Sequence, residues 1–314
     1  MILFPNAKIN LGLFITEKRP DGFHNIETIL FPIPLCDALE CVETYGQVET
    51  QCIASLYIHG IKIDGNPTEN LVYKAYELLK NDFNLPNIRI DLLKKIPFGA
   101  GLGGGSADAA FMLKLLNQKF MLKISDEKLE NYARKIGSDC AFFIKNKPVF
   151  AYEKGDKFEP INLDLSGYQL VLICPPIHVS TKTAYQNVVA RNGSAFREPQ
   201  RPNHTSVAEA LEATGRFDPL ARICNPCQEH FDLRKLSEIP MNEWKTVLQN
   251  DFEPSVFAQY PILSDIKQNL YDLGAEYASM SGSGSAIFGL FSKEQRVEKN
   301  KRLTNHFDYQ SFIL

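Results

Sequence analysis

The stretch Pro97-Phe98-Gly99-Ala100-Gly101-Leu102-Gly103-Gly104-Gly105-Ser106-Ala107 places five glycines in seven consecutive positions. Glycine frees the backbone to curl, so several amide N–H groups can point into one concavity and bind an anion. An Ala-rich helix is expected to open at Ser106 and would add the positive end of its dipole. The loop is therefore predicted to cradle phosphates, with the Ser106 hydroxyl reaching a phosphate oxygen or Mg²⁺.

Three different roles for this glycine loop fit the flanking residues less well. A flexible linker would not normally lie between Ile96-Pro97 and an amphipathic helix. A P-loop needs Lys-Ser or Lys-Thr directly after its last glycine, and Ser106-Ala107 stand there instead. The spacing of Gly99, Gly101 and Gly104 does match a dinucleotide-binding fingerprint with Asp126 as its acidic residue, but Asp126 is expected to begin a helix and no βαβ unit precedes the loop.

Hydrophobic periodicity on both sides of the loop predicts alternating strands and helices. Apolar residues alternate from Ala7 to Ile15, which predicts a half-buried strand with Lys8 and Asn10 on its polar face. Helices are expected over 67–82, from 106 onward, and over 126–136, the last with Ser125 as N-cap and Gly137 at its end. The remaining expectations are strands over 88–92 and 168–174, helices over 179–189, 242–249 and 261–273, and two short strands joined by Ser281-Gly282-Ser283-Gly284-Ser285.

Length and composition indicate a two-domain globular protein. The chain has 314 residues, and we expect domains over 1–163 and 164–314, the second with a polar surface insertion at about 191–240 that carries a short helix near 206–213. The net charge of -3 provides no basic face for nucleic acid, and no apolar stretch approaches the roughly 20 residues that span a membrane. The first residues lack a basic leader, so a cytoplasmic protein is expected. Seven cysteines favour reduced thiols, and Cys224 and Cys227 alone make a weak metal or redox motif.

Six separated segments resemble the superfamily of galactokinase, homoserine kinase, mevalonate kinase and phosphomevalonate kinase. The segments Pro97–Ala107 and Ser279–Ser285 are similar to its two glycine motifs. Asn6–Leu13, Lys18–His24, Gly137–Asp139 with Phe142-Phe143, and Gln249–Pro254 narrow the resemblance to the branch that phosphorylates 4-diphosphocytidyl-2-C-methyl-D-erythritol. Two departures are Phe23, where tyrosine is more usual, and the length of the 191–240 segment.

The resemblance implies an α+β fold of two domains, the N-terminal one like the second domain of a ribosomal protein and the C-terminal one ferredoxin-like. It implies that ATP, with Mg²⁺, gives its γ-phosphate to the 2-hydroxyl of the cytidine diphosphate substrate in the non-mevalonate isoprenoid pathway. Two other functions stay open, namely a sister kinase for another small alcohol and a non-catalytic nucleotide-binding module.

The resemblance assigns roles to particular residues. Asp139 would accept the substrate's proton and Lys8 would orient it, while Asn10 would bind substrate hydroxyls. Phe23 and His24 would bind the cytosine, with Tyr185 on its other face. Phosphate contacts fall to Pro97, Phe98, Gly99, Ala100, Gly101, Leu102, Gly103, Gly104, Gly105, Ser106 and Ala107, and the metal contact to Ser106.

Each assignment has a plainer alternative. Asp139 could cap the segment that follows it, Lys8 could be a solvated strand lysine, and His24 could be a surface histidine. The Ser281–Ser285 segment could be no more than a hairpin turn, although it could also be a second backbone cradle for phosphate.

Overall fold

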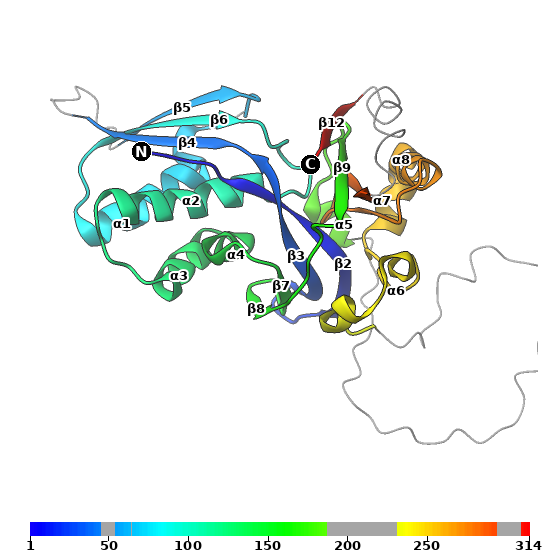
Figure 1. Cartoon of the computed structure of the whole chain (residues 1–314). Coiled ribbons are helices and arrows are strands. Elements are labelled where there is room, and N and C mark those ends of the chain that lie inside the picture. The colour runs from blue at the N-terminus through cyan, green and yellow to red at the C-terminus, as the bar shows by residue number, and fades with distance from the viewer. Residues whose placement is uncertain (45–53, 64, 187–230, 294–308) are drawn as a thin grey trace, which may run out of the picture.

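The computed structural model describes residues 1–44, 54–63, 65–186, 231–293 and 309–314. Its N-terminal half contains two four-stranded sheets and a layer of helices (Figure 1). The strands are β1 (Ile2–Leu3), β2 (Asn6–Lys18), β3 (His24–Cys36), β4 (Ala38–Glu43), β5 (Ala54–Gly60), β6 (Ile88–Lys94), β7 (Val149–Tyr152) and β8 (Lys157–Pro160). The helices are η1 (Pro67–Glu69), α1 (Leu71–Phe83), α2 (Gly104–Lys119), α3 (Asp126–Ile136), η2 (Ser138–Ala141) and α4 (Phe142–Lys145).

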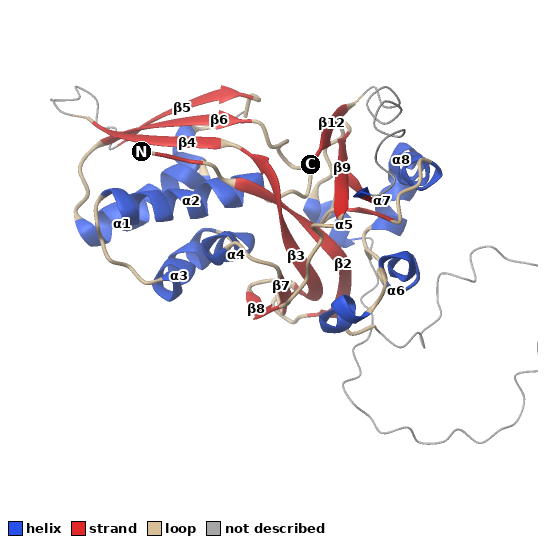
Figure 2. Ribbon diagram, viewed as in Figure 1, coloured by secondary structure: helices blue, strands red, loops and turns tan. Residues whose placement is uncertain are grey.

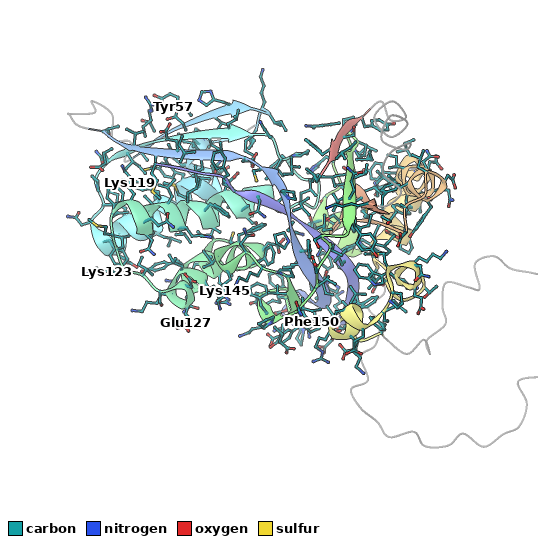
Figure 3. All side chains as sticks on the ribbon, in the orientation of Figure 1. Tyr57, Lys119, Lys123, Glu127, Lys145 and Phe150 are labelled. Atoms are coloured by element: carbon teal, nitrogen blue, oxygen red, sulfur yellow. The ribbon has the colours of Figure 1, made fainter. Side chains whose placement is uncertain are left out.

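The first sheet has the order β1-β4-β6-β5, and helices α1 and α2 cover one of its faces (Figure 2). Alternate residues of β4 and β6, among them Leu39, Cys41 and Ile90, point into the core that these helices complete. Tyr57 on β5 belongs to the outer face of the sheet and is 51% exposed (Figure 3). This layered arrangement places the end of β6 directly before the glycine loop and the start of α2 directly after it.

The second sheet, β2-β3-β7-β8, carries the strand predicted over Ala7–Ile15. That strand exists as β2, but every residue from Asn6 to Ile15 is buried, so the prediction of a solvent-facing polar side was wrong. The reason is tertiary. On one side of the strand Ile9 packs in one core with Leu172 and Phe288 of the C-terminal half, and on the other side Lys8 lies against the glycine loop, where a Cβ on Gly103 would be 3.2 Å from Lys8 Cε. Lys8 and Asn10 do share one side of the strand, but that side faces the interior of a site.

The C-terminal half is a third sheet with helices packed on it. Its strands β9 (Tyr168–Cys174), β10 (Tyr277–Met280), β11 (Ile287–Ser292) and β12 (Gln310–Ile313) pair antiparallel in the order β10-β11-β9-β12. The helices are α5 (Thr181–Gln186), η4 (Leu233–Glu238), η5 (Met241–Glu243), α6 (Trp244–Val247), α7 (Glu253–Gln259) and α8 (Pro261–Asp272). Leu263, Ile266 and Leu270 of α8 pack on the sheet.

Several predicted helices occur with altered bounds. Helix α2 begins at Gly104 with Gly103 as its N-cap, two residues before the predicted start at Ser106, because glycine can follow a left-handed cap directly into a helix. The helix expected over 242–249 is two short pieces, η5 and α6. Most of the 191–240 segment, the helix predicted near 206–213 and Cys224/Cys227 lie outside the described residues.

Helices α3 and α8 agree with their predictions. Ser125 caps α3 through a bond from the Lys128 amide, and Gly137 ends it. Within the described ranges, no helix combines the length and apolar character needed to cross a membrane.

Candidate active site

The glycine loop leads into α2 through three left-handed residues, Gly99, Gly101 and Gly103, with φ of +68°, +76° and +71°. No hydrogen bond joins the amide N–H groups of residues 101–106 to an acceptor within the described part of the chain. The side chains of Ala100, Leu102 and Ala107 are buried in the cores on either side, and Phe98 is 63% exposed. The loop therefore offers a backbone surface of unpaired donors at a helix N-terminus, which suits an anion.

Lys8 and Asp139 meet beneath this loop. The Lys8 Nζ lies 3.6 Å from Asp139 Oδ2, and the Lys8 amide donates to the Leu102 carbonyl at 2.9 Å. A Cβ built on Gly103 would lie 3.2 Å from Lys8 Cε, so the lysine side chain runs along the loop. Burial lowers the pKa of Lys8, and the Asp139 charge partly offsets that effect.

Asp139 occupies η2, directly beyond the end of α3. Its side chain is 43% exposed, so a substrate hydroxyl can approach it. The capping alternative is not supported, since η2 and α4 have Gly137 and Ala141 as N-caps without side-chain capping bonds. Cys140 lies beside Ser106, and burial raises the pKa of this thiol to about 12, an effect that the Ser106 hydroxyl partly opposes. Ser106, in the first turn of α2, is therefore next to the segment that carries Asp139.

Asn10 is held by protein partners in this structure. Its Oδ1 accepts a bond of 2.6 Å from Lys8 Nζ, and its Nδ2 donates to Thr28 Oγ1 at 3.0 Å. Thr28 Oγ1 in turn donates to the Gly12 carbonyl. Asn10 thus orients Lys8, a role that the sequence did not reveal, and Thr28 was missed altogether.

The Ser281–Ser285 turn joins β10 to β11, as predicted, and packs against the glycine loop. Ser281 Oγ donates to the Gly101 carbonyl at 2.9 Å, and the Ala286 amide donates to the Ala100 carbonyl at 3.2 Å. The two glycine segments are far apart in sequence but form one continuous surface beside Lys8 and Asn10.

The residues predicted to bind the base lie at the start of β3 and on α5. The rings of His24 and Tyr185 stack with centroids 4.8 Å apart and an interplanar angle of 17°. Burial and the nearby Lys18 lower the pKa of His24, while burial and Asp139 raise the pKa of Tyr185 to about 12. Phe23 is 59% exposed and has Lys154 Nζ 5.2 Å from its ring centroid. The stacked His24 and Tyr185 rings therefore lie near Asp139, and they leave no room for a base between them.

A buried ion cluster behind the loop was not predicted. Lys94, at the end of β6, pairs with Asp37 and also with Asp108 on α2 at 2.6 Å. Asp37 Oδ1 accepts bonds from the Lys95 and Ile96 amides at 2.5 and 2.9 Å. Burial raises the pKa of Asp108 to about 7 against the opposing effect of Lys94. The cluster ties the residues that precede the loop to those that follow it, and no local pattern in the sequence indicates it.

The site contains few metal ligands of its own. In the described ranges, no group of three or more His, Cys, Asp or Glu side chains could enclose a metal ion. Mg²⁺ fits such a site, because it is usually held by substrate phosphates with one or two protein oxygens. The Ser106 hydroxyl, in the first turn of α2, is the protein oxygen predicted to contact it.

Comparisons with known proteins agree with this geometry. The families described as "GHMP kinases N terminal domain" and "GHMP kinases C terminal" match residues 70–147 and 200–307. Among solved structures, a 4-(cytidine 5'-diphospho)-2C-methyl-D-erythritol kinase superimposes with a TM-score of 0.68 at 28% identity, over 100% of this chain and 98% of the other. Mevalonate kinase of Methanococcus jannaschii, at 15% identity, has a TM-score of 0.57 over 100% and 97% of the two chains and shares the fold.

Curated relatives are closer in sequence. A 4-diphosphocytidyl-2-C-methyl-D-erythritol kinase of Bacteroides fragilis is 50% identical over 299 residues, which cover 95% of each chain. The enzyme of that name from Porphyromonas gingivalis is 42% identical over 314 residues and all of both chains. With relatives this similar along its length, the chain belongs to the 4-diphosphocytidyl-2-C-methyl-D-erythritol kinase family of the GHMP kinases.

Proposed function

We propose that this protein transfers the γ-phosphate of ATP to the 2-hydroxyl of 4-diphosphocytidyl-2-C-methyl-D-erythritol, a step of the non-mevalonate isoprenoid pathway. The observation that carries the proposal is the Lys8–Asp139 pair beneath the unpaired amides of residues 101–106. Phosphoryl transfer requires alignment and charge stabilisation, and this arrangement supplies both.

In this mechanism Asp139 accepts the proton of the attacking hydroxyl. The Lys8 ammonium, fixed by Asn10, stabilises negative charge between that hydroxyl and the γ-phosphate. The loop amides and the N-terminus of α2 hold the phosphates, and Ser106 would hold Mg²⁺, which neutralises phosphate charge when bound.

The cytosine is assigned to Phe23, His24 and Tyr185. Because His24 and Tyr185 stack directly, we propose that the base enters between the exposed Phe23 ring and Tyr185, and that His24 moves aside to bond an edge of the base. In this arrangement Phe23 supplies the aromatic ring that a tyrosine more usually supplies in the family.

We further propose a ribosomal-protein-domain-2-like fold for residues 1–163 and a ferredoxin-like fold for residues 164–314. The strand order β10-β11-β9-β12, antiparallel throughout, supports the second assignment. A cytoplasmic protein without nucleic-acid or membrane partners is proposed from the free thiols of Cys36, Cys41, Cys140 and Cys174 and from the slight negative charge.

The test is ATP-dependent ADP release with Mg²⁺ and the cytidylyl substrate, run beside mevalonate and homoserine. Turnover on the cytidylyl substrate alone, abolished in Asp139→Ala, supports the proposal. Turnover only on mevalonate or homoserine would reassign the acceptor, and a folded protein that binds ATP without turnover on any acceptor would favour the binding-module alternative.

A further inference from the structure

The segment Gln249–Glu253 carried part of the family resemblance, and no catalytic or binding role has so far been attached to it. It lies between β2 and the Ser281–Ser285 turn. On the β2 side, the Leu13 amide donates to the Gln249 carbonyl at 2.8 Å and the Asp251 amide donates back to the Leu13 carbonyl at 2.9 Å. The Asp251 carboxylate also accepts from the Ile15 amide at 2.8 Å. The segment is thus fastened to the strand that carries Lys8 and Asn10.

On the other side, the segment holds the turn and the end of β10 that leads into it, through two buried side chains. Asn250, 3% exposed, donates from Nδ2 to the carbonyls of Met280 and Gly282, each at 2.8 Å. Glu253 Oε1 accepts from the Met280 amide at 2.9 Å and from Ser279 Oγ at 3.0 Å, and Lys267 pairs with its other oxygen at 2.6 Å.

The turn needs such external support. Gly282 and Gly284 have φ of +56° and +89°, and glycine loses more conformational freedom on ordering than any other residue. The amides of Gly282, Ser283 and Ser285 have no acceptor among the described residues, whereas the Gly284 amide closes the turn on the Ser281 carbonyl. A Cβ built on Gly282 would lie 3.4 Å from Asn10 Oδ1, so these free donors lie beside the catalytic strand.

We propose that Asn250 and Glu253 are positioning residues that hold the three free turn amides at the distance from Lys8 and Asn10 that phosphoryl transfer requires. This deepens the proposed function and rests on it. The segment acts as a spacer, since one run of residues bonds β2 through its backbone and the Asp251 carboxylate, and bonds the turn and the end of β10 through the side chains of Asn250 and Glu253. A shift of about 1 Å at this point is expected to lower turnover by about 100-fold.

The test compares Asn250→Asp with Asn117→Asp as a matched control. Asn117 also donates from Nδ2 to a backbone carbonyl, that of Ile124, but at the far end of α2. In Asn250→Asp a carboxylate oxygen faces two carbonyls, so we expect kcat about 100-fold lower, the KM of the cytidylyl acceptor about tenfold higher, and the KM of ATP within about threefold of wild type. If Asn250→Asp only reduced the amount of folded protein, kcat corrected for the folded fraction and both KM values would equal those of wild type, and that result would overturn the proposal.

Amide hydrogen exchange provides a readout that needs no substrate. Residues 277–286 should exchange faster in Asn250→Asp than in wild type or Asn117→Asp, and Glu253→Gln, which keeps an acceptor for Met280 but loses the charge that pairs with Lys267, should give a smaller increase. Unchanged exchange in both variants would overturn the proposal. If the wild-type protein does not phosphorylate the cytidylyl acceptor, the proposed function is overturned. The hydrogen-exchange comparison would still test whether Asn250 and Glu253 position the turn.

Discussion

At the scale of single residues, the central feature is a buried lysine whose charge is balanced by a half-exposed carboxylate. Lys8 contacts Asp139 on one side and Asn10 on the other, so its ammonium group has few positions open to it. Asp139 stays accessible to a hydroxyl. This division suits the two proposed roles, because a stabilising cation must be fixed and a general base must be reached by substrate.

Asp139→Asn is expected to lower kcat by about 10²- to 10⁴-fold, as for loss of a general base. The variant also tests the pKa of Lys8. The wild-type rate should fall on the alkaline side below pH 10.5, because burial lowers the pKa of Lys8 and the ammonium form is lost as pH rises through it. Since the Asp139 charge raises that pKa, its removal should move the alkaline limb to lower pH. An alkaline limb at the same pH in wild type and in Asp139→Asn would contradict the coupling between the Asp139 charge and the pKa of Lys8.

His24→Ala is expected to raise the KM of the cytidylyl acceptor by roughly 5- to 150-fold, corresponding to about 1–3 kcal/mol for a base contact. The KM of ATP should not change. His59→Ala is the control, because His59 is an exposed histidine on β5 that pairs with Asp91 at 3.6 Å. Equal acceptor KM values in the two variants would remove His24 from the base site.

At the scale of elements, two glycine segments from opposite halves of the chain build one surface. The glycine loop leads into the N-terminus of α2, and the Ser281–Ser285 turn connects β10 to β11. Their contact is so close that a Cβ on Gly101 would lie 2.0 Å from the Ser281 carbonyl oxygen. Glycine at 101 is therefore required by the neighbouring backbone as well as by its own φ.

Gly101→Ala should lower kcat/KM for ATP by more than about 100-fold, because the two segments must separate. Gly155→Ala is the matched control, since φ there is +80° and the nearest atom to a new Cβ is the flexible Ile26 Cδ1 at 3.1 Å. The control should lose only about 1–2 kcal/mol of stability, the cost of the left-handed backbone. Similar kinetics in the two variants would show that the close contact is unimportant.

Lys94→Met should destabilise the fold by about 3–5 kcal/mol in urea unfolding, because Asp37 and Asp108 would remain buried without their cation. Lys119→Met removes a partly exposed ion pair, in which Lys119 Nζ lies 3.3 Å from Glu43 Oε1. This change should lower the free energy of unfolding by no more than about 1 kcal/mol. A Lys94 variant as stable as the Lys119 control would mean that the cluster tolerates an unpaired state.

At the scale of the whole molecule, the two halves share their cores. Ile9 packs with Leu172 and Phe288, and Leu13 with Val171 and Phe252. Strand β2 therefore belongs to the packing of both halves, which explains why it is buried on both faces.

Because of this shared core, the protein should unfold in one transition. Trp244 is the single tryptophan and is buried in the C-terminal half, so its fluorescence reports that half. Urea curves from fluorescence and from far-ultraviolet circular dichroism should superimpose. Two separated transitions would show that the halves fold independently.

The local features could be predicted from the sequence. The alternation from Ala7 to Ile15 predicted β2 and the common side of Lys8 and Asn10, Ser125 and Gly137 predicted the ends of α3, and the glycine run predicted the loop between β6 and the N-terminus of α2. Each depends on backbone periodicity or on capping, which neighbouring residues determine.

Only the tertiary structure decided which remote segments contact one another. It buries both faces of β2, starts α2 at Gly104, turns Asn10 toward Lys8, assembles Asp37, Lys94 and Asp108, and sets Asn250 against the Gly282 carbonyl. The family resemblance suggested that Lys8 meets Asp139, but no spacing in the chain requires it. Contacts between remote segments depend on how sheets and helices pack, and that packing is determined by the whole set of buried side chains rather than by any local pattern.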